Sequence, residues 1–575
     1  MSADINESFL DNILEQRADY ISDNAIVENT AVSDYFQEII ETLLKKQTTL
    51  IVGPRGCGKT HMMRYAYMKC IDNSKYPLAI YVSFNKYYRL EPMLFSRTNA
   101  INLFHTWVLA RIILSVYEHV ITHLDEITDE QIDLAFDFLN IDEVKKLVDK
   151  LERSMPLNSE ELIIVECLSI SRLQSILYNT LSLCERKRVV LLLDDAALTL
   201  TPDYMTEFFD IFRAVKNTYI SLKASVYPGT TEYGARFHPH QEGSVVQVWL
   251  SVNNANYLSS MIAIANTRIE NFEQIPQEVC EFLAYAAFGI PRAYLFMLLN
   301  YKEKNFSTAQ QGLNKIVQTH YESLISEFET LAIKSPKLKS IIEIGGDVFK
   351  KIIIDFKKFN DKLYESNLKQ IILGVTNIDE NPMVTRMFNL LVEAGLLYNL
   401  GEVSHGDDRS YARFIPHISA LIDSRAFSGK NKGGSAKQVN ERLSQKNNRQ
   451  PLRRSAASLI DKKVFEKLRF DLPACIHCGT QRINISQKFC HNCGTELIDG
   501  SIFEKCMSMP FYSVPGLTSW QIIRIKKELA HLKTIGDFLS IQDPGTELRK
   551  IKNVGKIRAE KIINLVSGYI DDFLQ

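Results

Sequence analysis

The sequence has no long hydrophobic run and no excess of either charge. A membrane-spanning helix needs about 20 consecutive apolar residues, and the 575-residue chain contains no such run. Its first residues are polar and acidic, without the basic and then apolar order of a signal peptide. We therefore expect a cytoplasmic protein that makes no membrane contact. Because 46% of the residues are hydrophobic, the chain is not disordered as a whole, and its length predicts about three or more domains.

The near-zero net charge of −1 hides an uneven distribution. Lys plus Arg compare with Asp plus Glu as 41 to 54 over 1–424, 13 to 3 over 425–470, and 13 to 11 over 471–575. A strongly basic segment beside an acidic body is typical of nucleic-acid contact, although a solvated linker has the same composition. Since 426–450 contains almost no large apolar residues, we expect a flexible basic linker over 426–469.

The sequence also lacks the even cysteine spacing of a disulfide-stabilised protein. Six of its ten cysteines are scattered through apolar or helical contexts. Such thiols stay reduced in the cytosol. We expect mostly buried core thiols at Cys57, Cys70, Cys167, Cys184, Cys280 and Cys506.

The other four cysteines form two C-x-x-C-G knuckles, separated by eleven residues. Each knuckle turns tightly enough for its two thiolates to meet one ion, and four sulfurs complete a closed tetrahedral shell. The pattern therefore predicts a structural Zn²⁺ in a zinc ribbon; paired disulfides are the alternative and are disfavoured in the cytosol. His477 and His491 lie inside the knuckles and are expected to be exposed and not to ligate. The predicted ligands are Cys475, Cys478, Cys490 and Cys493.

Short apolar strands alternate with helices over the first 250 residues. This alternation predicts a parallel sheet covered by helices on both faces. A second helical region follows over 252–330, and then a helix leads into two strands joined by a polar turn, the pattern of a winged helix. The strands of the sheet are expected over 48–53, 77–85, 187–195 and 218–228.

The first of these strands runs into a G-x-x-x-x-G-K-[ST] sequence, and a helix follows it. In that context the glycines allow backbone N–H groups to surround phosphate oxygens at a helix N-terminus. Lys59 is expected to reach the β- and γ-phosphates of ATP, and the Thr60 hydroxyl to ligate Mg²⁺. The predicted nucleotide-binding residues are Gly53, Pro54, Arg55, Gly56, Cys57, Gly58, Lys59 and Thr60.

The third strand ends in two carboxylates. Asp194 fits the position that holds Mg²⁺ through its water, and Asp195 fits the position that polarises the attacking water. Two surface carboxylates that cap a buried strand would give the same sequence. Ser225, near the end of the fourth strand, is a candidate for sensing the γ-phosphate.

These motifs, with Gly-Ile-Pro-Arg at 289–292 opening a later helix, resemble an AAA+ ATPase of the origin-recognition/initiator type. The resemblance covers about 20–425. It implies a helical lid whose sensor-2 arginine is Arg292, unless that side chain is a solvated helix-terminal arginine. It also implies assembly into a homo-oligomer or with a partner protein, in which Arg236, or second Arg213, is the candidate arginine finger. Prokaryotic stand-alone relatives are often linked to genome defence or mobile elements.

One departure from the initiator pattern is the second acid. Initiator-type enzymes usually carry Asp-Glu where this chain has Asp194-Asp195. STAND-type switch ATPases favour Asp-Asp and also carry a winged helix, so slow hydrolysis and a switch-like use of nucleotide are expected. The second hypothesis is therefore a STAND-type scaffold that gates assembly with a protein partner.

The C-terminal residues 551–562 resemble a helix-hairpin-helix, a motif that grips duplex DNA through its backbone. The N–H groups around Gly555 are expected to face a phosphate at a helix start. Upstream, 514–517 and 531–539 look like the rest of a doubled hairpin, and protein docking is the alternative use of such a fold. Asn553 replaces the usual glycine, and Asn also tolerates a left-handed backbone. The predicted DNA-contacting residues are Asn553, Gly555, Lys556, Arg558 and Lys561.

The sequence as a whole therefore predicts an α/β P-loop ATPase that couples ATP, Mg²⁺ and Zn²⁺ to the engagement of duplex DNA. The expected order is an ATPase core over 1–250, a helical lid over 251–334, a winged helix over 335–425, a linker over 426–469, a zinc ribbon over 470–500 and a helix-hairpin-helix domain over 508–575.

Overall fold

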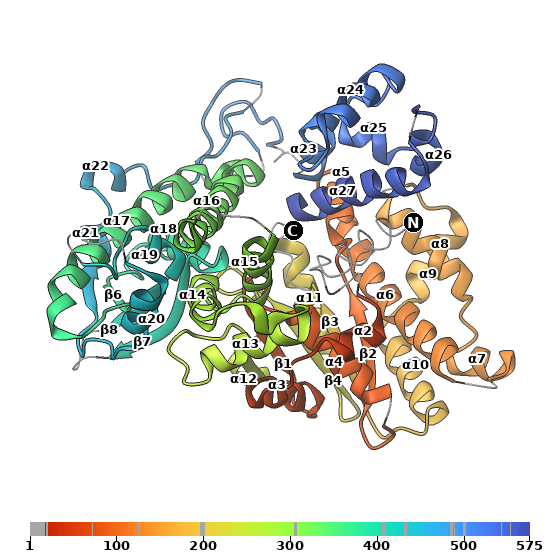
Figure 1. Cartoon of the computed structure of the whole chain (residues 1–575). Helices are drawn as coiled ribbons and strands as arrows, with labels where there is room; N and C mark the ends of the chain where they lie inside the picture. Colours follow the sequence, from red (N-terminus) through yellow and green to blue (C-terminus); the bar gives the residue numbers. More distant parts are fainter. Residues whose placement is uncertain are drawn as a thin grey trace.

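A computed structural model gives the structure of the chain (Figure 1). It describes residues 18, 21–71, 73–124, 127–153, 155–195, 202–303, 308–404, 410–429, 434–475, 477–483, 487, 489–497, 502–541, 543–552 and 554–574.

The N-terminal part is built on a five-stranded sheet with the order β2-β3-β4-β1-β5, in which every neighbouring pair is parallel. The predicted parallel sheet is confirmed. β5 was not predicted, because its four residues follow a glycine-containing loop and carry little periodicity. The strands are β1 (Thr49–Val52), β2 (Leu78–Ser83), β3 (Val189–Asp194), β4 (Ile220–Val226) and β5 (Ser244–Gln247).

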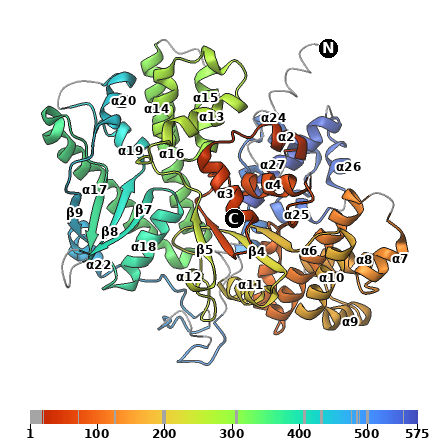
Figure 2. The same cartoon turned by 90° about the horizontal axis from the view of Figure 1, so that it is seen from below.

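Helices cover both faces of this sheet (Figure 2). Alternate residues of one strand point to opposite faces, so Val190 and Leu192 of β3 pack with α3 (Asp34–Leu44) and α4 (Lys59–Ile71). Leu191 of the same strand packs with α6 (Ala100–His123) and α11 (Pro202–Val215) on the other face. β3 is therefore buried on both sides, as its continuous apolar sequence requires.

Helix α6 is the one helix in the described part that is long and apolar enough to cross a membrane. Of its most apolar 18-residue window, 67% is buried inside the protein. Trp107 and Ile113 are completely buried against the sheet. The helix therefore belongs to the core of the ATPase region.

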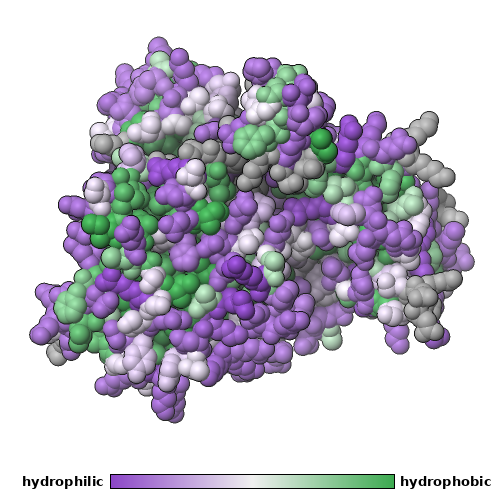
Figure 3. Space-filling model, turned by 180° about the vertical axis from the view of Figure 1, so that it is seen from behind, coloured by the Kyte–Doolittle hydropathy of each residue, from purple (hydrophilic) through white to green (hydrophobic). Residues whose placement is uncertain are grey.

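Five further helices flank α6 between β2 and β3, and several apolar side chains on or next to them are exposed, Phe138 and Leu134 most of all. Figure 3 shows apolar side chains gathered on the side of the molecule that carries these helices. The remaining helices of the core are α2 (Asp23–Glu28), α5 (Glu91–Ser96), α7 (Asp129–Ala135), α8 (Ile141–Glu152), α9 (Ser159–Cys167), α10 (Ile170–Leu183) and α12 (Pro239–Glu242).

The lid and the second sheet share one continuous hydrophobic core. Helices α16 and α17 pack against each other, and α17 also packs on α18, the helix between the first two strands of the second sheet. The helices are α13 (Tyr257–Arg268), α14 (Gln277–Ala287), α15 (Pro291–Glu303), α16 (Ala309–Lys334), α17 (Lys339–Leu363), α18 (Pro382–Glu393) and α19 (Ile418–Asp423).

The second sheet has the order β7-β8-β6-β9. The predicted hairpin is present, since β7 and β8 are antiparallel and follow α18. The fourth strand, β9, was not predicted and pairs parallel with β6. The strands are β6 (Leu373–Thr376), β7 (Leu397–Ser404), β8 (Ser410–Pro416) and β9 (Leu452–Ser455).

The prediction of a flexible linker over 426–469 is wrong for the part of it that the structure describes. β9 lies inside this segment, and α20 (Ala436–Ser444) packs on α14 through the buried side chains Val439 and Leu443. α21 (Ala456–Leu459) and α22 (Lys462–Phe465) follow. The isolated apolar residues of this basic segment are buried by distant elements, which explains why the local sequence resembles a linker.

The last helices pack against the ATPase core at α5 (Figure 1). The backbone N–H of Phe503 donates to Glu91 Oε2 (2.8 Å), and Lys505 Nζ donates to the Ile333 carbonyl at the end of α16 (2.6 Å). This C-terminal domain therefore contacts both the core and the lid region. Its helices are α23 (Ile502–Ser508), α24 (Ser519–Glu528), α25 (Ile535–Leu539), α26 (Pro544–Leu548) and α27 (Lys556–Leu574).

Candidate nucleotide, metal and DNA sites

The loop between β1 and α4 is shaped by two glycines in the left-handed region. Gly56 has a φ of 82° and Gly58 a φ of 97°, which disfavour any side chain. A Cβ at Gly58 would meet no atom within 4 Å, so open space lies over this part of the loop. Lys59 Nζ donates to the carbonyls of Gly53 (2.6 Å) and Pro54 (3.1 Å). The loop thus curves around the ammonium group of Lys59.

Arg292 lies directly against this loop. It opens α15, and its backbone N–H donates to the Gly56 carbonyl (3.4 Å). A Cβ at Gly56 would approach the Arg292 Cβ to 3.2 Å. Both residues line the same cavity as Lys59 and Thr60. The structure therefore brings the predicted lid arginine to the phosphate-binding loop.

Asp194, at the end of β3, is completely buried and accepts two hydrogen bonds. Ser225 Oγ donates to its Oδ1 (2.6 Å), and the Tyr81 hydroxyl donates to its Oδ2 (3.0 Å). The Asp195 N–H donates to Ser225 Oγ (2.9 Å). Ser225 therefore holds both acids of the pair in place.

This geometry changes the interpretation of Ser225. Its hydroxyl is engaged by Asp194 and Asp195, and the side chain does not line the cavity. The side chain that reaches the cavity from the end of β4 is Tyr227, whose ring centroid lies 4.3 Å from Lys59 Nζ. Burial raises the pKa of Tyr227, so its hydroxyl stays protonated. No motif in the sequence favours Tyr227 over Ser225.

The other end of the cavity is closed by the N-terminal segment and the lid. The Thr30 hydroxyl lies 2.7 Å from His61 Nε2, and Arg268 of α13 donates to the Asn29 carbonyl (3.1 Å). Burial and the neighbouring Arg268 lower the pKa of His61 to about 3, so its ring is neutral. Apolar side chains also line the cavity: Phe36, Val248, Leu250, Met261, Ile264 and Leu295.

The donor set fits ATP with Mg²⁺. The open backbone around Gly58 and the ammonium of Lys59 suit phosphate oxygens, and the apolar side chains of the lining suit a planar base. Thr60 and Asp195 line the cavity, and Asp194 lies at the end of β3, which is separated from β1 by β4. A hydroxyl and carboxylates are the oxygen ligands that Mg²⁺ prefers.

The two candidate arginine fingers lie outside this cavity. The Arg236 side chain is 74% exposed and lies 3.5 Å from Asp210, while Arg213 of α11 is 51% exposed and lies 3.3 Å from Glu242. Both are accessible to a neighbouring molecule. Their role stays a prediction.

The four knuckle cysteines converge on one point. Their sulfur atoms all lie within 4.8 Å of one another, and both the Cys475–Cys493 and Cys478–Cys490 pairs are 3.5 Å apart. Tetrahedral Zn²⁺ with bonds of about 2.3 Å places sulfurs about 3.8 Å apart. Hydrogen bonds with Thr480 and Thr495 lower the pKa of Cys478 and Cys493, which favours thiolates that bind metal, whereas the pKa of Cys475, which hydrogen-bonds with Cys493, is raised. The cluster therefore fits one zinc ion.

The two knuckles repeat the same backbone geometry. The Gly479 N–H donates to the Cys475 carbonyl (2.8 Å), and the Gly494 N–H donates to the Cys490 carbonyl (2.9 Å). Both glycines have φ near 70°, so each turn requires glycine. His477 and His491 are exposed, as expected, and His491 hydrogen-bonds with Gln487.

Of the six other cysteines, Cys57, Cys70, Cys280 and Cys506 are buried, as predicted. Cys184 is half-buried and Cys167 is exposed, which contradicts the core position expected for Cys167. Cys167 ends α9, where its side chain leaves the core face of that short helix.

Gly555 precedes α27 and is exposed beside Lys556, Arg558 and Lys561, which are also exposed. A Cβ at Gly555 would meet no atom within 4 Å, and its φ lies outside the left-handed region. The fold itself therefore does not require glycine there. By contrast, Gly516 of the upstream turn has a φ of 86° and would press a Cβ to 3.0 Å from Leu565. The predicted Asn553 lies outside the described residues.

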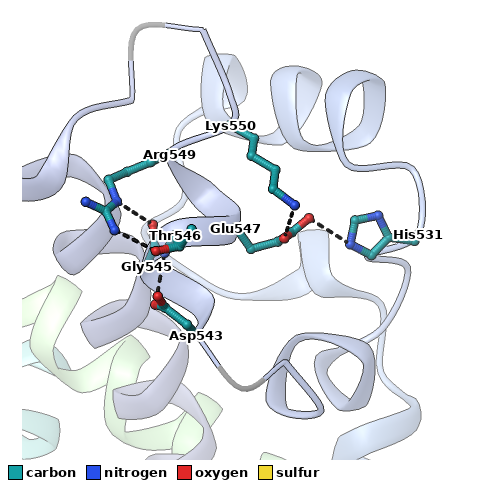
Figure 4. Close-up of polar contacts among 7 residues, drawn as sticks. All are labelled: His531, Asp543, Gly545, Thr546, Glu547, Arg549 and Lys550. Atoms are coloured by element: carbon teal, nitrogen blue, oxygen red, sulfur yellow. Dashed lines mark hydrogen bonds and ion pairs between the residues drawn. The ribbon is translucent and has the colours of Figure 1, made fainter.

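The segment that leads to Gly555 is fixed by short-range polar contacts (Figure 4). Asp543 caps α26 by accepting from the Thr546 N–H (3.0 Å), and Arg549 donates to Thr546 Oγ1 (2.6 Å). Glu547 accepts from Lys550 (2.6 Å) and lies 3.4 Å from His531. Arg549 and Lys550 are thus both engaged within the domain.

A family model described as ORC-CDC6-like matches residues 13–362. Three solved structures are similar at low identity. A Walker-type ATPase of Pyrococcus abyssi has a TM-score of 0.37 and 12% identity, covering 68% of this chain and 95% of its own. The Orc1 protein of Aeropyrum pernix, solved in complex with DNA, has 0.30 and 14%, covering 72% and 94%. Cdc6p from Pyrobaculum aerophilum has 0.24 and 12%, covering 71% and 93%. A search of curated protein sequences finds no match.

Proposed function

Since the chain belongs to the ORC-CDC6-like family, we propose that it is an AAA+ ATPase that uses ATP binding and slow hydrolysis to control its grip on duplex DNA. The observation that carries the first half is the meeting of Arg292, Lys59 and Asp195 around one cavity. Such a cavity, shared between core and lid, senses the phosphates from both sides. A bound zinc ion in the ribbon is part of the same proposal.

Each residue of the cavity has a distinct task in this proposal. Lys59 neutralises the β- and γ-phosphates, and Arg292 links the lid to them. Asp194, held by Ser225 and Tyr81, orients the water shell of Mg²⁺, and Asp195 orients the attacking water. Bound Mg²⁺ supplies charge neutralisation for phosphoryl transfer. Because aspartate is shorter than the usual glutamate, we expect weak polarisation of that water and slow hydrolysis.

The test of the nucleotide site is ATP binding and phosphate release by the full-length chain. Lys59→Ala should lose both, because it removes the ammonium that faces the phosphates. Lys69→Ala, on the last turn of the same helix α4, is the matched control and should behave like the parent. Asp195→Asn should keep ATP binding and lose turnover. Normal hydrolysis by Lys59→Ala would show that the site is wrongly assigned.

The second half of the proposal is that the start of α27 binds the DNA backbone. The open space at Gly555 lets a phosphate reach the first N–H groups of the helix, and Lys556, Arg558 and Lys561 add positive charge. Phosphate contacts carry little sequence information, so little sequence preference is expected. Affinity should fall with salt, with a log–log slope of roughly −0.9 per phosphate neutralised.

Gly555→Glu tests this contact, since it places a carboxylate where the phosphate would lie. Gly568→Glu is the matched control, because Gly568 lies on the same helix and also has open space around its Cβ position. Duplex binding is measured by fluorescence anisotropy at several salt concentrations. Equal binding by both variants and the parent would refute the hairpin contact and favour protein docking.

A STAND-type switch that gates a protein partner is the second candidate, and the Asp194-Asp195 pair favours it. The ATP hydrolysis rate with and without duplex DNA separates the two. Stimulation by DNA supports the first proposal, whereas an unchanged rate supports the switch. Assembly into a homo-oligomer with ATP, lost in Arg236→Ala, would support a finger that acts between copies.

A further inference from the structure

Trp520 is the only one of the three tryptophans that is exposed. Its exposed fraction is 39%, whereas that of Trp107 is 0% and that of Trp249 is 3%. It lies on the first turn of α24, directly after the upstream turn that contains Gly516. The fold thus presents its largest aromatic side chain at the surface of the C-terminal domain.

Two guanidinium groups from different helices lie close to the indole. The Arg524 Cζ is 5.9 Å and the Arg558 Cζ is 5.8 Å from the centre of the ring. Arg524 belongs to α24 and Arg558 to the first turn of α27. This contact places Trp520 next to the helix start that carries Gly555, so the two turns of the domain share one surface.

One isoleucine extends this surface. Ile523 is 64% exposed and follows Trp520 by three residues on α24, which puts both on one helix face. We name Trp520, Ile523, Arg524 and Arg558 the tryptophan face.

A grip on phosphates alone does not use such a face. Phosphate oxygens bind N–H groups and cations, and they gain nothing from an indole or from an isoleucine side chain. A ligand that matches the face has a flat apolar ring beside a negative charge. A nucleotide whose base is unpaired has this combination, because every base offers a π-face for stacking on an aromatic side chain.

We infer that Trp520 stacks on an unpaired base adjacent to the phosphate held at Gly555. The C-terminal domain then prefers DNA in which duplex adjoins unpaired nucleotides over uninterrupted duplex. This inference rests on the proposed DNA contact of α27 and names the form of DNA that the contact selects. Arg558 serves both parts, since it lies over the ring and belongs to the helix that meets the phosphate.

The preference has an expected size. Stacking of one base on an aromatic side chain changes affinity by about 5- to 150-fold. Trp520→Leu should remove this factor and leave the affinity for uninterrupted duplex unchanged. Trp520→Phe, which keeps a ring, should retain part of it.

The experiment titrates the full-length chain with two labelled DNAs, one an uninterrupted duplex and one the same duplex with a short unpaired thymine tract. Anisotropy gives the two affinities. Tryptophan fluorescence gives an independent signal, because stacking on thymine quenches Trp520 while Trp107 and Trp249 are buried. Tyr512→Leu is the matched control: Tyr512 is 51% exposed on the same domain with Lys526 Nζ 3.9 Å from its ring, but lies outside the tryptophan face.

The expected result is tighter binding and quenching with the unpaired tract, both lost in Trp520→Leu and both kept in Tyr512→Leu. Equal affinity for the two DNAs, or a preference that survives Trp520→Leu, overturns the inference. In that case loss of duplex binding in Gly555→Glu would still support the proposed function. Absence of DNA binding by the parent overturns both.

Discussion

Ser225→Ala is the most direct test of how the nucleotide site is held together. The substitution removes the hydroxyl that donates to Asp194 (2.6 Å) and accepts from the Asp195 N–H (2.9 Å). Ser225 and Asp194 are 1% and 0% exposed, so water cannot replace the lost donor. A hydrogen bond to a charged group contributes about 1.5–3 kcal/mol. Asp195 is only half-buried, so its backbone N–H can hydrogen-bond to water instead, which adds little to the loss of stability.

We therefore expect Ser225→Ala to lower the free energy of unfolding of the ATPase region by about 2–3 kcal/mol. Ser221→Ala is the matched control on the same strand. Ser221 is also buried, but its hydroxyl donates at 3.3 Å to the neutral carbonyl of Val189, so its loss should cost about 1 kcal/mol. ATP hydrolysis should fall more than ATP affinity in Ser225→Ala, because Asp194 is no longer held in one orientation.

Unfolding in urea is followed by tryptophan fluorescence in a Trp520→Phe background, so that the signal comes from Trp107 and Trp249. Tyr81→Phe removes the second donor to Asp194 (3.0 Å). Because both substitutions act on one carboxylate, the double variant should cost about 0.5–3 kcal/mol more than the sum of the two. A Ser225→Ala variant no less stable than Ser221→Ala would refute the argument that Ser225 positions the acid pair.

Three further predictions concern other parts of the chain. Burial lowers the pKa of Lys223 to about 7, so between pH 7 and the ordinary pKa of lysine the unfolded chain binds more protons than the folded one. In that range the free energy of unfolding of the parent should rise by about 1 kcal/mol per pH unit relative to Lys223→Met. Urea unfolding measures this up to about pH 9.5, roughly where tyrosine ionisation begins. Cys478→Ser should abolish zinc binding in metal analysis and spare ATP binding, whereas Cys167→Ser, which changes an exposed thiol, should keep zinc. Gly289→Ala should weaken ATP binding strongly, because the new Cβ would clash with the Leu250 carbonyl oxygen below the lid. Gly401→Ala is the control, since Gly401 is also left-handed but has open space around its Cβ position. It should lower the free energy of unfolding by about 1–2 kcal/mol and leave ATP affinity unchanged.

The sequence predicted the parts of the fold whose signal is local. The phosphate-binding loop, the acid pair and the knuckles are each contiguous, and each lies where its motif implied. β3 was recognisable because a strand buried on both faces has a continuous apolar sequence. The cavity wall formed by Thr30, His61 and Tyr227 was not, because these residues meet only through tertiary packing.

The same reason explains the two misjudged features. Val439, Leu443 and Leu452 are each surrounded by polar or charged neighbours in the sequence, and their partners lie on α14 and β6. Ala436, Val439 and Leu443 do follow helical spacing, but the few apolar residues of this window stand in a basic and polar composition that is also typical of a linker. Ser225 was recognised as a polar strand end, but its hydrogen bonds to Asp194 depend on the register of β3 and β4.

The position of β9 determines where this chain can be divided. A cut near residue 425 would leave β6 with one unpaired edge and would strip β9 of its only strand partner among the described residues. An unpaired edge of this kind invites aggregation, and the detached piece would carry Leu452 and Leu459 into water. During synthesis the second sheet likewise stays incomplete until residue 455 has left the ribosome, although its first strand ends at residue 376. Fragments for study of the C-terminal DNA contact are therefore better begun after residue 470 than at the start of the basic segment.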